Sequence, residues 1–319
     1  MMRIVAGDVG GTKALLQLVE ATAEGRRVAL EQRYQSSAYA TFDLLLADFL
    51  GRLDGTIDSA CFAVAGPVIG DRAEVTNLGW SVDAEALAKK HSIARVALIN
   101  DFYAVALGVP LLAPADMVSL NAATRVEHAP IAILGAGTGL GEANLFFDGV
   151  QWMVVPGEGG HADFAPQDEQ QAQLLISLQR KYGDHVSWER LLSGMGLVNI
   201  HNFLSGAERP YDETIPMEIA AAAAAGDRTA GRAFEIFVDI YGAEAGNMAL
   251  RTLARGGVFL AGGIAAKNVG CFTDGRFMAA FVRKGRFQSL LAGIPVDVIT
   301  NPNVGLLGAA EAARRLIAG

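Results

Sequence analysis

Two stretches of the sequence share one pattern and decide the fold. The first, Arg3–Val19, reads RIVAGDVGGTKALLQLV, and the second, Ile131–Phe147, reads IAILGAGTGLGEANLFF. In each, a short apolar run leads into a glycine-rich turn and then into a second apolar run. Short runs joined by such a turn predict a β-hairpin rather than a strand followed by a helix. Two copies, one in each half, are what an internally duplicated α/β protein with two phosphate-binding hairpins would show.

The glycine-rich turns have the composition of phosphate-binding loops. In GDVGGT (7–12) the glycines let the backbone approach phosphate oxygens, Thr12 can donate a hydroxyl hydrogen bond, and Asp8 can hold a hydrated Mg²⁺. Either turn alone is as well explained by an ordinary hairpin. Two turns that combine Gly and Thr in matching halves favour a nucleotide site. The residues expected there are Gly7, Asp8, Val9, Gly10, Gly11, Thr12, Gly137 and Thr138, with Asp8 binding the metal through water.

Two other nucleotide-binding motifs do not fit. A Walker A loop requires Gly-Lys followed by Ser or Thr, and the sequence contains no Gly-Lys pair. The stretch GEGGHA (157–162) formally matches a dinucleotide-binding fingerprint. However, it puts the carboxylate of Glu158 where a pyrophosphate would pass, and we expect no helix to begin before Pro166. A phosphate site built from the two β-hairpins is therefore the remaining interpretation.

The rest of the chain alternates predicted strands and helices without a low-complexity linker. We expect a small α/β domain at 1–111, with the C-terminal helix in 301–319 packing back on it, and a large α/β domain at 112–300. The predicted strands are Ser59–Ala65, Arg95–Ile99 and Gly256–Gly263, and the predicted helices are Asp83–Lys90, Glu169–Tyr182, Ala220–Ala225, Arg228–Leu253 and Glu311–Ile317.

Composition narrows the class of protein. The 319 residues are 51% hydrophobic and carry 34 acidic against 26 basic side chains, a net charge of −8 without a Lys/Arg block, so nucleic-acid binding is not expected. Cys61 and Cys271 are far apart and no CxxC pair exists, which makes a structural zinc site improbable. The N-terminus lacks a signal-peptide pattern, and no apolar run could span a bilayer. We expect a soluble, cytoplasmic protein.

A set of polar residues follows the predicted strands. Asn100 and Asp101 come directly after a buried strand, where α/β proteins place their chemistry, although an Asp there is by itself more often a helix cap. Glu158 and His161 share a glycine-rich loop that gives their side chains little to pack against. With Glu189 they supply several acceptors and one imidazole, which is what a ring of sugar hydroxyls requires.

Together these motifs resemble the bacterial glucokinase family, the non-ROK group of the hexokinase–actin ATPase superfamily. The similarity runs nearly end to end, and its most specific part is the block Pro156–Ala165 together with Glu189. Lys13 departs from the Asn that is common in this group. Lys is usual in ROK kinases, but their cysteine zinc motif is missing here. The matching segments are Gly7–Thr12, Ala65–Pro67, Thr76–Trp80, Ile99–Phe102, Gly135–Gly141, Pro156–Ala165, Glu189–Gly194 and Phe259–Ile264.

The resemblance implies a duplicated actin-like ATPase (ribonuclease H-like) α/β fold, with two lobes and a cleft. It also implies transfer of the γ-phosphoryl group of ATP to the 6-hydroxyl of glucose, with Mg²⁺ as cofactor, in a homodimer whose lobes close over the sugar. Asp101 is then the general base. The same comparison implies that Asn100, Asp101, Glu158, His161 and Glu189 hold glucose, and that Ala261, Gly262 and Gly263 lie near the adenosine.

Two alternatives remain open at this point. Another hexose or N-acetylhexosamine kinase on the same fold would differ in how it reads the 2- and 4-positions of the sugar. A non-catalytic sugar sensor or an actin-like ATPase belongs to a different class. A sensor is expected to carry a DNA-binding module, and we expect none before the strand that begins at Arg3. An actin-like ATPase would hydrolyse ATP without sugar.

Overall fold

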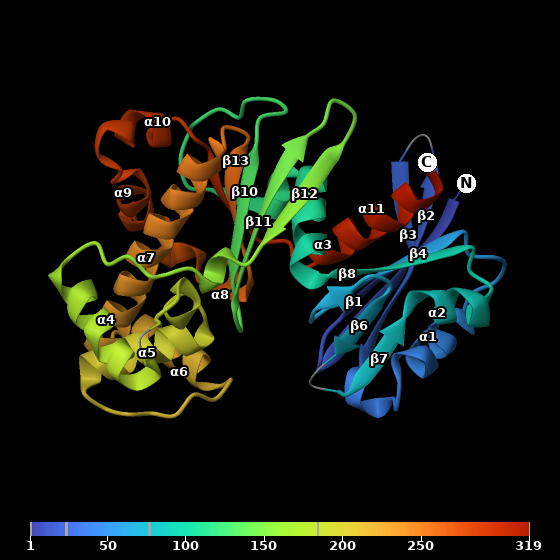
Figure 1. The fold of residues 1–319 in the computed structure, drawn as a ribbon, viewed down its shortest axis with the longest axis horizontal. Helices are drawn as coiled ribbons and strands as arrows, with labels where there is room; N and C mark the ends of the chain where they lie inside the picture. The colour runs from blue at the N-terminus through green and yellow to red at the C-terminus, as the bar shows by residue number, and fades with distance from the viewer. Residues whose placement is uncertain (1, 23–24, 76–77, 184, 319) are drawn as a thin grey trace. The chain divides into compact units, whose positions relative to one another are not determined.

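The computed structural model describes residues 2–22, 25–75, 78–183 and 185–318. The chain divides into two compact units. Unit 1 comprises Met1–Leu112 and Pro302–Gly319, and unit 2 comprises Ala113–Asn301. Each unit is an α/β body built around its own sheet (Figure 1). Within the described residues, no helix is both long enough and apolar enough to cross a membrane.

The sheet of unit 1 has five strands in the order β3-β2-β1-β4-β8. The predicted hairpin is confirmed, since β1 and β2 pair antiparallel around the turn at 10–12. β3 continues antiparallel from β2, whereas β4 pairs parallel with β1 and β8 pairs parallel with β4. The strands are β1 (Met2–Val9), β2 (Lys13–Thr22), β3 (Gly25–Gln35), β4 (Ser59–Val64) and β8 (Arg95–Asn100).

Helices cover both faces of this sheet. On one face, α1 (Phe42–Leu50), α2 (Ala84–His91) and a small three-stranded sheet bury Phe42, Phe62 and Trp80. On the other face, α3 (Asp101–Gly108) and α11 (Val304–Ala318) pack on Ile4 and Ala6 of β1. Alternation along β1 therefore turns Asp8 toward the face that carries α3. The small sheet consists of β5 (Val68–Ile69), β6 (Arg72–Val75) and β7 (Trp80–Asp83).

Helices α3 and α11 meet through glycine backbone. A methyl group built on Gly308 would lie 1.8 Å from the carbonyl oxygen of Ala104, and one built on Gly108 would lie 2.1 Å from that of Val304. Ser59 adds a hydrogen bond from its hydroxyl to the carbonyl oxygen of Ala313, at 2.8 Å. The last helix is thus part of unit 1, where it supports the helix that begins with Asp101.

Unit 2 repeats the strand order and directions of unit 1. Its sheet runs β12-β11-β10-β13-β14-β9. β10, β11 and β12 form an antiparallel meander, and β13 and β14 add in parallel on the other side of β10, as β4 and β8 do in unit 1. This confirms the predicted duplication. The strands are β9 (Met117–Ser119), β10 (Ile131–Ala136), β11 (Leu140–Phe147), β12 (Trp152–Gly157), β13 (Gly257–Ala261) and β14 (Val296–Ile299).

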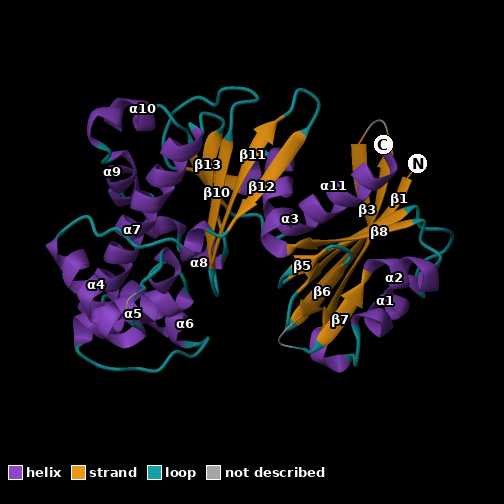
Figure 2. Ribbon diagram, viewed as in Figure 1, coloured by secondary structure: helices purple, strands orange, loops and turns teal. Residues whose placement is uncertain are grey.

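The helices of unit 2 surround the long helix α7, which packs against β10 (Figure 2). They are α4 (Glu169–Tyr182), α5 (Gly194–Ser205), α6 (Ile215–Ala224), α7 (Arg228–Thr252), α8 (Gly263–Lys267), α9 (Arg276–Val282) and α10 (Gln288–Ala292). Both units also contain short 3₁₀ turns. These are η1 (Ser36–Ala38), η2 (Val109–Leu111), η3 (Pro114–Asp116), η4 (Gly159–His161), η5 (Trp188–Arg190), η6 (Val269–Cys271) and η7 (Gly285–Phe287).

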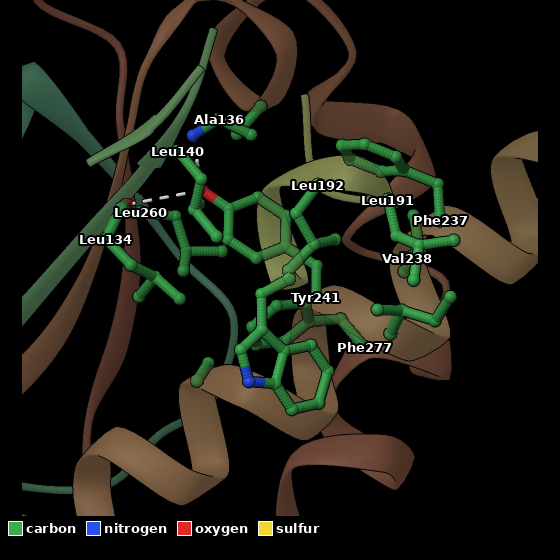
Figure 3. Close-up of a cluster of buried hydrophobic side chains, with 14 of the residues drawn as sticks. Leu134, Ala136, Leu140, Leu191, Leu192, Phe237, Val238, Tyr241, Leu260 and Phe277 are labelled. Carbon is green, nitrogen blue, oxygen red and sulfur yellow. Dashed lines mark hydrogen bonds between the residues drawn. The ribbon is translucent and has the colours of Figure 1, made fainter. Parts of the chain in front are cut away.

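One buried tyrosine ties α7 to the sheet (Figure 3). The hydroxyl of Tyr241 donates to the carbonyl oxygen of Leu134 at 3.2 Å and accepts from the amide of Ala136 at 3.1 Å. The ring is fully buried among Phe237, Phe277 and their neighbours. Because Ala136 is the last residue of β10, this contact fixes the strand just before its glycine-rich turn.

Several element boundaries differ from the sequence prediction. The expected strand Gly256–Gly263 ends at Ala261, because Gly262 adopts a positive φ of 84° and Gly263 begins α8. The last helix begins at Val304 rather than at Glu311. Helix α7 ends one residue early, since Leu253 turns to a left-handed φ of 51°. Thr76 and Asn77, part of the Thr76–Trp80 motif, lie outside the described residues.

The glycine contact between α3 and α11 generates a prediction. Gly308→Ala would push a methyl into the carbonyl oxygen of Ala104, and neither backbone can move away cheaply. We expect a loss of about 1–3 kcal/mol in the free energy of unfolding, the usual cost of overpacking. Chemical denaturation measures it.

The matched control is Gly305→Ala on the same helix. Its methyl would lie 3.8 Å from a methyl carbon of Val105, which is ordinary contact. Alanine also favours a helix over glycine by about 1 kcal/mol. Equal stability of the two variants would contradict the packing described.

Candidate active site

In unit 1, two carboxylates lie at the same edge of the sheet. Asp8 pairs in register with Ala63 of β4, and Ala63 pairs with Ile99 of β8. The three strands are parallel, so their carboxyl ends meet at one edge, where Asp101 follows directly after β8. Two strand spacings separate Asp8 from Ile99, or about 10 Å. The two acidic side chains are therefore close enough to share a substrate or an ion.

Asn100, rather than Asp101, caps helix α3. The side-chain oxygen of Asn100 accepts hydrogen bonds from the amides of Phe102 at 2.9 Å and Tyr103 at 3.2 Å. Its amide nitrogen donates to the carbonyl oxygen of Gly66 at 3.4 Å. Asp101 is left at the first helical position with its side chain exposed, and one carboxylate oxygen accepts from the amide of Phe102 at 2.8 Å. The capping role that an isolated Asp would suggest belongs to its neighbour.

Both carboxylates hold their protons more tightly than usual. Burial, and then the charge of Asp101, raise the pKa of Asp8 to about 6. Burial also raises the pKa of Asp101, against donors from Phe102 and Asn100 that lower it. Solvent still touches both side chains, so the desolvation comes from the protein atoms crowded around them rather than from full enclosure. A carboxylate with a raised pKa is the better proton acceptor.

The segment that contains the first glycine-rich turn is buried at its start and exposed at its end. Gly7 is buried inside β1, where a methyl group would lie 2.5 Å from Leu16 and 2.7 Å from Phe62, so this glycine serves the core. The turn itself is closed by a hydrogen bond from the amide of Gly10 to the carbonyl oxygen of Lys13, at 3.0 Å. Thr12 and Lys13 follow with exposed side chains. The exposed parts of the predicted phosphate loop are therefore its tip and the side chain of Asp8.

In unit 2, Glu189 sits directly under the second glycine-rich turn. Its Oε2 accepts a hydrogen bond from the amide of Leu140 at 3.0 Å, and a methyl group on Gly139 would lie 2.6 Å from the same oxygen. The amide of Gly194 donates to the carbonyl oxygen of Gly137 at 2.8 Å. The structure thus brings a predicted sugar ligand into contact with the turn predicted to hold phosphate.

The loop that carries Glu158 and His161 packs on the same turn. A methyl group on Gly160 would lie 2.3 Å from the carbonyl oxygen of Leu140. The glycine backbone faces inward, while the side chains of Glu158 and His161 are 90% and 59% exposed, with Nε2 and Oε2 3.9 Å apart. A single 3₁₀ turn spans Gly159–His161, and the first α-helix after the loop begins at Glu169, beyond Pro166, as expected.

Ala261-Gly262-Gly263 ends at the same edge of the unit 2 sheet as the turn. Strand β13 pairs parallel with β10, and Gly262 lies so close to β10 that a methyl group would be 2.4 Å from the carbonyl oxygen of Ala136. Its positive φ and this approach both require glycine. The predicted adenosine residues and Gly137-Thr138 are therefore neighbours in one unit.

Asp8 is the residue that the sequence predicts to hold a metal ion. Among the residues that the structure describes, no cluster of three or more His, Cys, Asp or Glu side chains forms a ready-made metal site. A solvent-accessible carboxylate with a second one nearby fits hydrated Mg²⁺, which keeps most of its waters and takes one or two protein carboxylates.

Sequence reasoning missed Glu142. This residue of β11 is 5% exposed, and burial followed by the charge of Glu244 raises its pKa to about 7. The available signal was a charged residue inside a mostly apolar strand, LGEANLFF. Such a residue is costly to bury and calls for an explanation.

The family assignment follows from comparison with known proteins. A family model described as Glucokinase matches residues 5–316, nearly the whole chain. The chain belongs to the glucokinase family. As a member of this family it is an ATP-dependent sugar kinase that phosphorylates glucose.

Similar proteins cover the chain end to end. A glucokinase of Nostoc sp. is 42% identical, covering 99% of this chain and all of the relative, and one of Photorhabdus laumondii is 36% identical, covering 98% and 97%. The crystal structure of a glucokinase from an Antarctic psychrotroph has a TM-score of 0.89 at 29% identity, covering 99% of both chains. The ROK hexokinase of Thermus thermophilus, at 20% identity and a TM-score of 0.70 over all of both chains, shares the fold.

The contact between Glu189 and the turn generates a prediction. Glu189→Ala removes the acceptor of the Leu140 amide, which we expect to lower the free energy of unfolding by about 1 kcal/mol or more. Glu189→Gln keeps a side-chain carbonyl oxygen at this place and should lose clearly less. Urea denaturation of the two variants checks this. A Gln variant as unstable as the Ala variant would contradict it.

Proposed function

We propose that Asp101 is the general base of this glucokinase. Its carboxylate accepts the proton of the sugar 6-hydroxyl as that oxygen attacks the γ-phosphorus of ATP. The bond from that phosphorus to the bridging oxygen of ADP breaks in the same displacement, which gives glucose 6-phosphate and ADP. The observation that carries this proposal is that two neighbouring residues, Asn100 and Asp101, have different roles at the start of α3. Asn100 caps α3, and Asp101 keeps an exposed carboxylate with a raised pKa.

The sugar is proposed to bind through Asn100, Asp101, Glu158, His161 and Glu189. Support comes from the outward direction of Glu158 and His161 and from their packing, through Gly160, on the turn that Glu189 holds. Carboxylates and an imidazole match sugar hydroxyls, each of which can donate and accept. In Asn100, the side-chain oxygen accepts the two capping hydrogen bonds, so a sugar hydroxyl would meet the amide nitrogen, which also donates to the carbonyl oxygen of Gly66 at 3.4 Å.

The nucleotide is proposed to bind along the glycine-rich turns. Thr12 and Thr138 donate to phosphate oxygens, together with backbone amides of Gly7–Thr12 and Gly137, and Ala261-Gly262-Gly263 lies near the adenosine. Asp8 would hold Mg²⁺ through water, and the ion when bound offsets the charge of the phosphate oxygens. The proximity of Asp101, whose charge raises the pKa of Asp8, supports a cation there. The homodimer implied by the resemblance is also a proposal, which sedimentation would test.

Replacing Asp101 tests the base. Asp101→Asn keeps the shape of the side chain and removes its ability to accept a proton. We expect kcat to fall by roughly 10²-fold or more, the scale of general acid–base catalysis, with the KM for glucose near that of the parent. The matched control is Asp54→Asn, an exposed Asp of unit 1 ahead of β4. Near-parental turnover of the Asp101 variant would sink the assignment.

Replacing Glu158 tests the sugar site. Glu158→Gln removes a charged acceptor from an exposed side chain, so folding should be unaffected while the KM for glucose rises. The measurement is steady-state kinetics at saturating ATP, with ADP release scored over a panel of hexoses. An unchanged KM for glucose would count against the role of Glu158.

A further inference from the structure

A buried carboxyl group lies directly beneath the loop that carries Glu158 and His161. In the sheet of unit 2, Glu142 of β11 stands in register between Leu134 of β10 and Gly157 of β12. Leu134 belongs to the core shared with α7, so the side chain of Glu142 points to the same face. Gly157, its partner on β12, has no side chain that would pack beside the side chain of Glu142. The carboxyl of Glu142 therefore has room to extend toward the end of β12.

The loop then folds back over this carboxyl. After β12 ends, the chain turns at Glu158, and Gly159 comes to rest on Glu142. A methyl group built on Gly159 would lie 1.9 Å from Oε2 and 2.9 Å from Cδ of Glu142, which supplies all three of its nearest neighbouring atoms. Gly159 does not have the left-handed φ that would demand glycine. What excludes a side chain at position 159 is the carboxyl of Glu142.

The surroundings of Glu142 favour its neutral form. Its Oε1 is buried and has no hydrogen-bond partner among the described residues. Glu244 of α7, fully buried, adds a like charge that raises the pKa of Glu142, and Arg251 lowers it only in part. Burial raises the pKa of Glu244 as well, although hydrogen bonds from Asn247 at 2.7 Å and Arg251 at 2.9 Å, and the charge of Lys284, favour its ionised form. Burial raises the pKa of Tyr241, another titratable neighbour, far above neutrality. Glu158 and His161 of the loop itself and Glu189 under the turn are further titratable groups of the elements packed here.

We propose that Glu142 is a positioning residue, whose buried carboxyl seats Gly159 and so holds the loop of Glu158 and His161 in its sugar-binding shape. Gly160 packs on Leu140 beside it, so the loop rests on two points of β11. The side chains of Glu158 and His161 project into solvent and depend on that seat for their direction. This inference rests on the proposed role of the loop in binding glucose.

If the contact between Glu142 and Gly159 positions the loop, a substitution at one residue should restore the glucose binding that a substitution at the other impairs. Glu142→Ala removes the seat, and Gly159→Ala forces a methyl into it, so each should raise the KM and the Kd for glucose roughly tenfold or more, as small misplacements of binding groups do. The double variant Glu142→Ala/Gly159→Ala puts the methyl where the carboxyl was, 3.7 Å from the remaining Cβ of residue 142. We expect it to recover to within about threefold of the parent. Effects of the single variants that multiply in the double variant would overturn the proposal.

The pH profile adds a readout that a purely structural role would not give. Glu142→Gln imitates the neutral acid and should bind glucose like the parent below pH 7. In the parent, the KM for glucose should rise as Glu142 ionises through its pKa of about 7, and the Gln variant should lack this rise while it keeps the pH dependence that Asp8 and Asp101 give to both proteins. Identical profiles would contradict the proposal.

The stability of the folded protein should also fall as pH rises and Glu142 ionises. The folded state holds the Glu142 proton between the ordinary pKa of 4.5 and about 7, so the stability that the neutral acid contributes is lost as pH rises through this range. The advantage of the Gln variant in Tm should therefore grow over this range and then level off. An advantage in Tm that does not change with pH would count against the proposal.

Asn144→Ala provides the matched control. Asn144 lies on the same strand and the same face, and its side-chain oxygen is also buried without a partner among the described residues, but it pairs with Val155 rather than with the loop. It should lower Tm and leave the KM for glucose unchanged. If Glu158→Gln raises that KM while every Glu142 variant leaves it unchanged, this inference fails and the proposed function stands. If Glu158→Gln leaves the KM for glucose unchanged, the proposed role of the loop in binding the sugar is wrong, and the inference on Glu142 falls with it.

Discussion

Backbone hydrogen bonds between β1, β4 and β8 are what the chemistry of unit 1 depends on. They pair Asp8 with Ala63 and Ala63 with Ile99, so that Asp8 and Asp101 come to the same edge of the sheet. A slip of one residue in β1 would turn Asp8 to the opposite face, into the core around Phe62. The charge of Asp101 raises the pKa of Asp8, and burial raises the pKa of Asp101. The proposed proton acceptor for the sugar hydroxyl and the proposed holder of a hydrated Mg²⁺ therefore come from one edge of one sheet.

In unit 2, the same strand order positions the loop that carries Glu158 and His161. Here the glycines of the loop and turn allow close approach, with Gly160 on the backbone of Leu140 and Gly139 on the side-chain carboxylate of Glu189. Because the main chain fills the inner side, the side chains of Glu158 and His161 have only the outer side to occupy. The buried acid Glu142 lies beneath them, against Gly159. The side chains proposed to bind the sugar are thus presented by packing between glycines and β11, in which Glu189 is the proposed sugar ligand that takes part.

The sequence predicted the parts of the fold whose pattern is local. Both hairpins, the duplication and helix α4 at Glu169–Tyr182 are confirmed, since apolar runs, glycine turns and helical spacing are visible in neighbouring residues. Strand β3 was missed because it is an edge strand with mostly exposed residues, and α5 because it begins with glycines that disfavour helix. The seat of Glu142 under Gly159 joins residues far apart in the sequence. Only the register of β11 and β12 reveals it.

In the proposed mechanism the carboxylate of Asp101 receives the proton of the reacting hydroxyl. A crystal structure of the protein with glucose and a non-hydrolysable ATP analogue tests this most directly. We expect the 6-oxygen of the sugar about 2.6–3.2 Å from a carboxylate oxygen of Asp101, or joined to it by one water, with Glu158, His161 and Glu189 on other hydroxyls. A 6-oxygen held instead by Asp8, or beyond the reach of Asp101, would contradict it.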